Sequence, residues 1–284
     1  DERRGVPMAG PRIEKDTVQE TLVVPLYGRM LGSELFPSIL QDPHARATLS
    51  RLDFDTSRLD RKRGSLAWKF GSLEGILRSR DILTEMGSYL KSHPQAAVVN
   101  MGCGLDSTPL LADNGSMRIY NIDRPDVIEA RDSLMPPMGR ERNLAADLRD
   151  TSAWIPEIDA TRGVFLFAAG VFMYFQADEV KDLVIGLRRA FPQGVLVFDT
   201  LGAVGMRTLM KGTLRTMGIK DVRGRFSCER PERDCAWADG LRVSSRPYLT
   251  GYVDLRSAGV QPILRTAARL FDSVMKMRVV RMEL

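Results

Sequence analysis

Two glycines, Gly102 and Gly104, follow a continuous apolar run in the stretch VVNMGCGLDS at residues 98–107. Glycine leaves the backbone bare, so ligand atoms can approach the chain where any side chain would collide. It also accepts the positive φ angle that a sharp turn needs. A plain tight turn would use the same residues, so the neighbouring strand ends must decide whether a ligand binds here.

Acidic residues end the next two predicted strands. Asp123 closes the segment 117–123, where its carboxylate can accept hydrogen bonds from both hydroxyls of a ribose. At Asp147 and Leu148, a carboxylate and the following backbone N–H can pair with the exocyclic amine and a ring nitrogen of adenine. Each feature alone is also typical of a helix cap or a solvated turn. Because the carboxyl ends of parallel strands meet at one edge of a sheet, the three features together predict an adenosine-containing ligand.

The residues after the glycine turn separate a dinucleotide from a methyl donor. A GxGxxG site needs a third glycine so that a helix N-terminus can meet a pyrophosphate, but Ser107 stands in that position. Asp106 beside it would repel two phosphates, whereas an acid is compatible with the sulfonium cation of S-adenosylmethionine. The sequence therefore predicts S-adenosylmethionine as the cofactor, and a nicotinamide oxidoreductase is the weaker alternative.

Strand and helix patterns alternate along the chain from about residue 68. Apolar residues recur at helical spacing over 68–92 and 180–191, and several apolar runs between them are continuous, as in strands covered on both faces. We expect strands at 96–102, 117–123, 142–147, 163–170, 194–200, 241–248 and 275–284, and a further helix at 260–271. This alternation predicts a doubly wound α/β fold in which a reversed last strand joins the parallel set.

The first part of the chain has a different pattern. Residues 17–31 and the segments around them are helical in character but lack strands. We therefore expect two regions: an N-terminal helical cap over residues 1–67, which would cover the substrate, and a cofactor-binding core over residues 68–284.

The composition is ordinary for one large globular unit, with 284 residues of which 44% are hydrophobic and 27% charged. Lysine and arginine outnumber acidic residues by 41 to 36, but the basic residues are scattered and the densest cluster, at 58–63, is typical of a solvated face. Nucleic-acid binding is therefore not expected. The longest apolar run, at 163–175, is too short to span a bilayer, and the polar N-terminus has no signal-peptide core.

The three cysteines, Cys103, Cys228 and Cys235, match neither a disulfide framework nor a paired CxxC zinc site. We therefore expect no metal site and a pair of inert thiols at Cys228 and Cys235. A reducing cytoplasm is the expected location.

Five segments resemble the bacterial branch of the leucine carboxyl methyltransferase family, which includes the tetracenomycin-type polyketide O-methyltransferases. They are PLYGRMLGS at 25–33, VVNMGCGLDSTP at 98–109, YNIDRPDVIEAR at 120–131, FLFAAGVFMYF at 165–175 and FPQGVLVFD at 191–199. The segments follow in order over most of the chain, and the glycine turn with the continuation of the second strand is the more specific part. The resemblance implies a class I methyltransferase: a Rossmann-like, seven-stranded sheet whose last strand is antiparallel, under an N-terminal helical cap.

The resemblance also implies site residues. In relatives an arginine from the helix before the first strand binds the methionine carboxylate of the cofactor; Arg78 fits this place, Arg80 is the alternative, and both could instead be exposed helix residues. A guanidinium fork suits a carboxylate, which lysine would not. An N-terminal lysine matters in some members, and Lys15 is the candidate. Two departures put the acceptor in doubt: Ala169 stands where relatives often carry glutamate, and the segment 108–111 lacks an arginine that usually follows the turn.

Few side chains could act as a base. His93 precedes a proline at a helix end, where a structural role is expected, and His44 lies in a predicted turn, where a capping role is favoured. Tyr27 and Tyr174 are the catalytic candidates, because their hydroxyls could orient an acceptor oxygen. A carboxylate acceptor is already ionised at neutral pH, so the shortage of bases favours an anionic acceptor.

These observations predict an S-adenosylmethionine-dependent O-methyltransferase that acts on a carboxylate or acidic hydroxyl of a small molecule. Methyl transfer is an in-line displacement, so holding the reacting atoms in line in a dry pocket is the main task of the protein. Two alternatives remain open: an enzyme that methylates the terminal carboxylate of a protein, and a non-catalytic cofactor-binding module.

Overall fold

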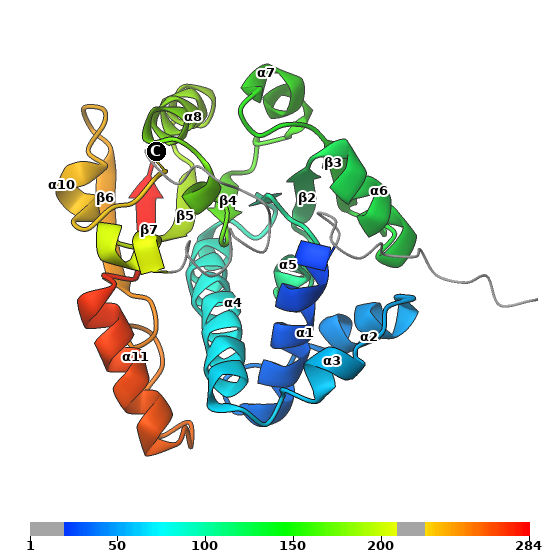
Figure 1. Ribbon diagram of the computed structural model, residues 1–284. Helices are drawn as coiled ribbons and strands as arrows, with labels where there is room; N and C mark the ends of the chain where they lie inside the picture. Colours follow the sequence, from blue (N-terminus) through cyan, green and yellow to red (C-terminus); the bar gives the residue numbers. More distant parts are fainter. Residues whose placement is uncertain (1–19, 209–224) are drawn as a thin grey trace, which may run out of the picture.

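A single seven-stranded sheet forms the centre of the computed structural model, which describes residues 20–208 and 225–284 (Figure 1). The strand order is β3-β2-β1-β4-β5-β7-β6. The first five strands in this order are parallel, and β7 lies antiparallel between β5 and β6. The strands are β1 Ala97–Met101, β2 Arg118–Asp123, β3 Glu141–Ala145, β4 Val164–Ala168, β5 Val195–Thr200, β6 Arg242–Pro247 and β7 Arg278–Glu283. The predicted fold and its reversed last strand are confirmed.

The central strands are buried because helices cover both faces of the sheet. Every residue of β1 and β4 is buried, whereas β3 and β6, at the two edges, are largely accessible. This is the environment that continuous apolar runs predict. β2 and β5 end at the predicted residues, whereas β1 and β4 end one and two residues early, because Gly102 and Gly170 adopt positive φ angles and turn the chain away.

Two groups of helices pack on the two faces. Apolar side chains of α4 and α11 cluster with one face of the sheet, and those of α7 and α8 cluster with the other. The apolar stripe of α8, which includes Val180 and Leu187, is fully buried, as its spacing predicts. The helices of the core are α4 Leu66–Ser92, α5 Thr108–Leu111, α6 Pro125–Leu134, α7 Thr151–Trp154, α8 Ala177–Ala190, α10 Pro231–Asp234 and α11 Pro262–Val274, with 3₁₀ turns η1 Ile155–Glu157 and η2 Phe172–Tyr174.

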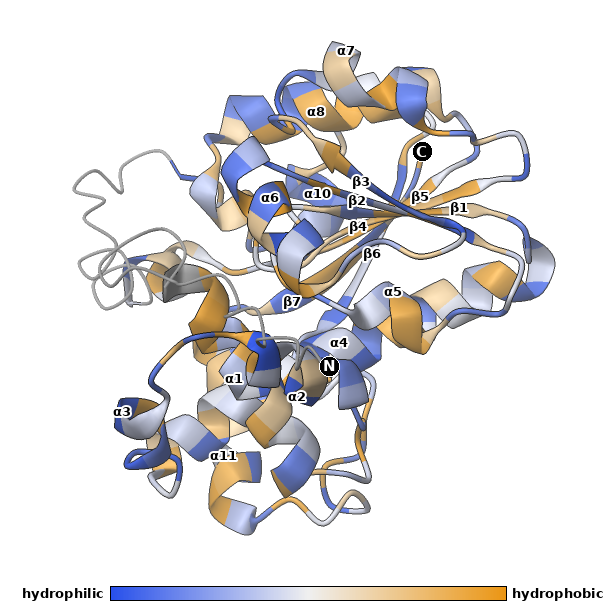
Figure 2. Cartoon of the chain, turned by 90° about the vertical axis from the view of Figure 1, so that its right-hand side faces the viewer, coloured by the Kyte–Doolittle hydropathy of each residue, from blue (hydrophilic) through white to orange (hydrophobic). Residues whose placement is uncertain are grey.

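The first three helices of the described residues, which we call the cap, lie together at one end of the molecule, below the sheet in Figure 2. They are α1 Glu20–Leu35, α2 Pro43–Arg51 and α3 Ser57–Asp60. A third apolar cluster joins the cap to the core, because Leu26 and Leu31 of α1 pack with Leu105 of the glycine turn and Leu134 of α6. Helix α4 begins beside the cap and ends at the sheet, so it belongs to both regions that the sequence predicts. Within the described residues, no helix is long and apolar enough to cross a membrane.

Candidate active site at the carboxyl edge of the sheet

Strand register brings the predicted site residues to one edge. Met101 of β1 pairs with Ile122 of β2, so Gly102 follows at the level of Asp123. Ala168 of β4 pairs with Phe198 of β5, which brings Asp199 to the level of the residue before Gly170. Parallel strands place ligands at this edge, and the glycine turn lies in its middle.

Different structural constraints favour glycine at positions 102 and 104. Gly102 has a φ of +68°, and a Cβ atom there would lie 2.6 Å from the Val171 side chain, so its absence permits close packing. Gly104 has a φ of +46°, and within the described residues a Cβ atom there would approach only the tip of Leu22, at 3.3 Å. The backbone of Gly104 therefore offers the bare approach that the sequence predicts for a ligand.

Asp123 is held beside this turn. Its Oδ2 atom accepts a hydrogen bond from the Gly104 N–H at 2.8 Å, and its Oδ1 atom accepts one from the Arg124 N–H at 2.8 Å. Burial raises the pKa of the Asp123 carboxyl. A carboxylate has about four lone-pair sites, so two remain for the hydroxyls of a ribose.

Asp147 and Leu148 lie at the end of β3. The Asp147 carboxylate accepts hydrogen bonds from the side chain and backbone of Arg149, at 2.9 and 3.0 Å, and these lower its pKa to about 2. Leu148 is buried, and its carbonyl accepts a bond from the Trp154 indole. Within the described part of the chain, the Leu148 N–H has no hydrogen-bond acceptor. An adenine ring could use that N–H, while its amine would share Asp147 with Arg149.

Arg78 and Arg80 lie on different sides of α4. A Cβ atom at Gly170 would lie 2.6 Å from Arg78 Nη1, and Asp199 Oδ2 is 3.9 Å from the same nitrogen. Arg80 is exposed and lines a surface depression with Lys91. Arg78 is therefore the arginine at the carboxyl edge of the sheet. The bare backbone of Gly104 leaves room for S-adenosylmethionine. The Asp123 carboxylate can accept bonds from its ribose, and the Arg78 guanidinium suits its methionine carboxylate.

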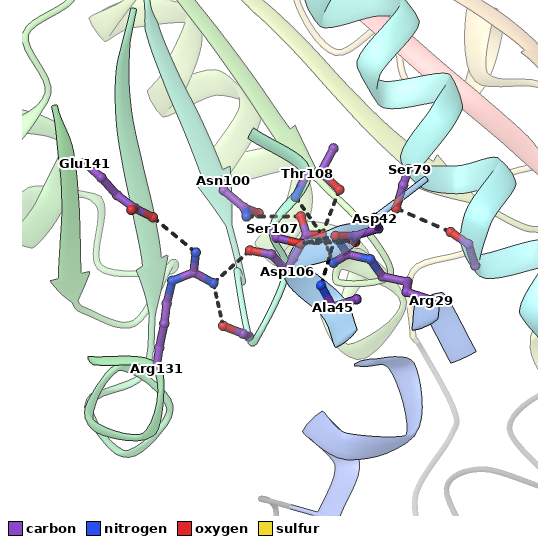
Figure 3. Close-up of polar contacts among 12 residues, drawn as sticks. Arg29, Asp42, Ala45, Ser79, Asn100, Asp106, Ser107, Thr108, Arg131 and Glu141 are labelled. Atoms are coloured by element: carbon purple, nitrogen blue, oxygen red, sulfur yellow. Dashed lines mark hydrogen bonds and ion pairs between the residues drawn. The ribbon is translucent and has the colours of Figure 1, made fainter. Parts of the chain in front are cut away.

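A polar cluster that the sequence did not reveal anchors the cap to the glycine turn (Figure 3). Arg29 of α1 forms ion pairs with Asp42 and Asp106 and donates a hydrogen bond to the Ser107 hydroxyl at 2.6 Å. Asp42 also caps α2 by accepting a bond from the Ala45 N–H at 3.0 Å. In the sequence, Asp106 and Ser107 disfavour a dinucleotide ligand. In the structure, the same two residues bind Arg29 of the cap.

A second buried arginine holds the turn from the opposite side. Arg131 of α6 is fully buried, and its Nη1 atom donates to the carbonyls of Gly104 and Asp106 at 3.0 and 2.8 Å. Its Nη2 atom pairs with Glu141 at 3.3 Å (Figure 3). Arg29 and Arg131 both lie in segments that resemble the family, which is the only signal in the sequence that could have drawn attention to them.

The two catalytic candidates among the tyrosines occupy different surroundings. The charges of Arg78 and Asp199 act on Tyr174, and burial raises the pKa of its hydroxyl. Tyr27 lies in the cap, where its hydroxyl donates to Asp60 at 2.6 Å and burial raises its pKa to about 12. Tyr174 therefore lies within the field of Arg78 and Asp199, whereas the Tyr27 hydroxyl binds Asp60 within the cap.

Neither histidine belongs to the site. The N-cap of α2 is Asp42, so the capping role expected of His44 is wrong; the carboxylate reaches the Ala45 N–H from the position before Pro43. His93 ends α4 and stacks on Tyr89, with ring centroids 4.4 Å apart, which is the structural role predicted for it.

The remaining sequence predictions are placed as follows. Lys15 lies outside the described residues. Cys228 and Cys235 are buried, with their sulfur atoms 3.5 Å apart. Within the described residues, no group of three or more potential ligands could hold a metal ion. Ala169 is half-buried and packs against the apolar cluster of α4.

The sheet order, the reversed last strand and the glycine turn define a class I methyltransferase fold. A model of the family described as leucine carboxyl methyltransferase matches residues 33–187, and the chain belongs to this family. The chain is 29% identical over 215 residues to the tetracenomycin polyketide synthesis O-methyltransferase TcmP of Streptomyces glaucescens, which covers 74% of this chain and 77% of the relative. The predicted family is confirmed.

A second relative is also a methyltransferase by name, and two solved structures share the fold. The S-adenosyl-L-methionine-dependent methyltransferase dpfgK of Gibberella zeae is 29% identical over 240 residues, or 75% of this chain and 78% of the relative. A putative methyltransferase from Thermobifida fusca shares the fold, with a TM-score of 0.55, 16% identity and coverage of 90% of this chain and 93% of that one. The plantazolicin methyltransferase BamL, crystallised with SAH, has a TM-score of 0.50 and 13% identity, and covers 94% and 98% of the two chains.

Proposed function

We propose that this chain is an S-adenosylmethionine-dependent O-methyltransferase that acts on a small molecule. One observation carries the proposal: the bare backbone of Gly104, the Asp123 carboxylate and the Arg78 guanidinium occupy one edge of one sheet. The names of the two curated relatives support a methyl donor, and the name of TcmP supports a small acceptor made by polyketide synthesis.

Each binding residue has one part of the donor to hold. Arg78 would pair with the methionine carboxylate, Asp123 would accept bonds from the ribose, and Leu148 with Asp147 would read adenine. Gly102 and Gly104 would leave room for the ligand at the turn. When bound, the donor supplies an electrophilic methyl group, and alignment of an acceptor with that group could account for as much as roughly 7–11 kcal/mol of the barrier.

The acceptor side of the site is formed by different residues. Tyr174 is the better placed of the two proposed catalytic tyrosines, because it lies within the field of Arg78 and Asp199, whereas Tyr27 would first have to release Asp60. The division into a cap at 1–67 and a core at 68–284, and the cytoplasmic location, remain predictions.

Donor binding tests the proposal directly. We expect calorimetry to show that Asp123→Ala and Gly104→Val weaken S-adenosylmethionine binding by about tenfold or more, since a bond to a charged group contributes roughly 1.5–3 kcal/mol. Arg78→Gln should do the same. Asp126→Ala and Arg80→Gln are matched controls, because Asp126 is exposed on α6 and Arg80 is exposed on α4.

Two outcomes would overturn the proposal. Wild-type affinity in all three site variants would mean that the donor site lies elsewhere. Donor binding without conversion to S-adenosylhomocysteine, across a panel of phenols and carboxylic acids, would favour the non-catalytic module instead.

A further inference from the structure

Glu74 carries a half-buried carboxylate at this site. Neither donor binding nor the packing of the fold explains a carboxylate at this position. It lies on α4 one turn before Arg78, and the charged groups that act on it are Arg78 and Asp199. Within the described residues, its side chain makes no hydrogen bond or ion pair. The Tyr248 hydroxyl donates instead to the Glu74 carbonyl, at 3.3 Å, which ties this turn of α4 to the end of β6.

The groups around Glu74 are unfavourable for an anionic acceptor. The charged groups that act on Glu74 are one cation, Arg78, and one further carboxylate, Asp199. The Tyr248 hydroxyl lies beside Glu74. Arg78 already lies 3.9 Å from Asp199, and the proposed function assigns it to the carboxylate of the donor. An acceptor carboxylate would therefore face Glu74 and Asp199 without a cation of its own, and like charges in a buried site repel strongly.

The same groups suit a neutral hydroxyl. An O–H group can donate to a carboxylate, and a carboxylate with no other partner is free to accept that bond. Burial raises the pKa of Glu74, which brings its proton affinity closer to that of a phenol and makes it a better base.

We propose that Glu74 accepts the proton of the acceptor, and that the acceptor is a neutral phenol or enol rather than a carboxylate. This inference rests on the proposed function and narrows it, and it departs from the anionic acceptor that the sequence favours. The acceptor oxygen forms the new bond to the methyl carbon, the carbon–sulfur bond breaks with its electron pair left on sulfur, and the O–H proton passes to the Glu74 carboxylate. Charge and atoms balance without a further reactant.

The first test is a binding measurement. Calorimetry on the protein saturated with S-adenosylhomocysteine would compare 2-naphthol with 2-naphthoate, which share a ring system but differ in charge. We expect the wild type to bind the naphthol about tenfold more tightly or better, and Glu74→Gln to reduce or reverse that preference. Glu129→Gln, which removes an exposed carboxylate from α6, should leave the preference unchanged.

The second test is a rate and its pH dependence. With a panel of phenols, Glu74→Gln should lower the methyl-transfer rate by about 10²–10⁴-fold at pH 7, and the loss should shrink as the pH rises toward the pKa of the phenol. Affinity for S-adenosylhomocysteine should stay within about threefold of the wild type, because Glu74 does not bind the donor; a residue that only positions Arg78 would change that affinity.

The outcomes separate the two levels of the proposal. Preferred binding or methylation of the carboxylates, or an unchanged preference and rate in Glu74→Gln, would overturn the role of Glu74 and leave the proposed function standing. Failure of the wild type to bind S-adenosylhomocysteine would overturn the proposed function itself.

Discussion

The Arg78 guanidinium occupies the space that a side chain at Gly170 would need. A Cβ atom at Gly170 would lie 2.6 Å from Arg78 Nη1, and Gly170 has a φ of +69°, which side-chain-bearing residues rarely adopt. The Gly170 N–H donates at the same time to Asp199. The turn after β4 is thus shaped around an arginine that comes from a helix 92 residues earlier in the chain.

Gly170→Ala should weaken donor binding because the added methyl group must displace Arg78 and the backbone must leave its preferred conformation. We expect an increase of about tenfold in the dissociation constant of S-adenosylhomocysteine, measured by calorimetry. Gly87→Ala on α4 is the control, since nothing lies within 4 Å of a Cβ atom there. Equal affinities for the two variants would contradict this account of the turn.

Asp199→Asn should separate the charge of Asp199 from its hydrogen bond. The amide oxygen can still accept from the Gly170 N–H, but the attraction to Arg78 is lost. We expect KM for the methyl donor to rise by about three- to tenfold, with a larger rise in Asp199→Ala, which also releases the Gly170 turn. A larger effect in Asn than in Ala would show that Asp199 acts in another way.

Arg29→Met should destabilise the protein because it leaves Asp42 and Asp106 without their common cation. The Arg29 side chain is only 6% exposed and that of Asp42 is fully buried, and removing one partner of a buried ion pair costs roughly 3–5 kcal/mol. Urea denaturation measures the loss. Arg46→Met breaks a pair with Glu34 in which the arginine is 66% exposed, and it should cost less than about 1 kcal/mol; similar losses would argue against the anchoring role of Arg29.

Asp81 should make the protein less stable at alkaline pH. It is 1% exposed, and neither carboxylate oxygen has a partner in the described part of the chain. Burial and the nearby Asp272 raise its pKa to about 9, with Glu85, Arg80 and Arg246 also acting on it.

The direction in which stability changes with pH depends on whether the folded or the unfolded state holds the proton of Asp81. The folded protein keeps the proton of Asp81 up to about pH 9, whereas the unfolded chain releases it near pH 4, so stability from this group is full below pH 4 and falls as the pH rises toward 9. Asp81→Asn cannot ionise, so its melting temperature should vary less between pH 5 and pH 9 than that of the wild type. Parallel curves for the two proteins would mean that Asp81 is already charged.

The sequence by itself determined the elements and the class of ligand. The apolar runs of β1 and β4 and the stripe of α8 are local patterns, because burial on both faces or on one face imposes a period that can be read directly. Gly104 and Asp123 could also be found, since Gly104 lies in the turn that follows one recognisable strand, Asp123 ends the next, and parallel strands share an edge.

Only the tertiary structure decided which side chains meet there. The choice between Arg78 and Arg80 depends on which side of α4 faces the sheet, and two residues of separation turn them to different sides. Arg29 lies 77 residues from Asp106, and Tyr248 lies 174 residues from Glu74. No local pattern encodes such contacts. They form only when the cap packs on the glycine turn and when the residue after β6 packs on α4, which brings a donor and an acceptor together away from water.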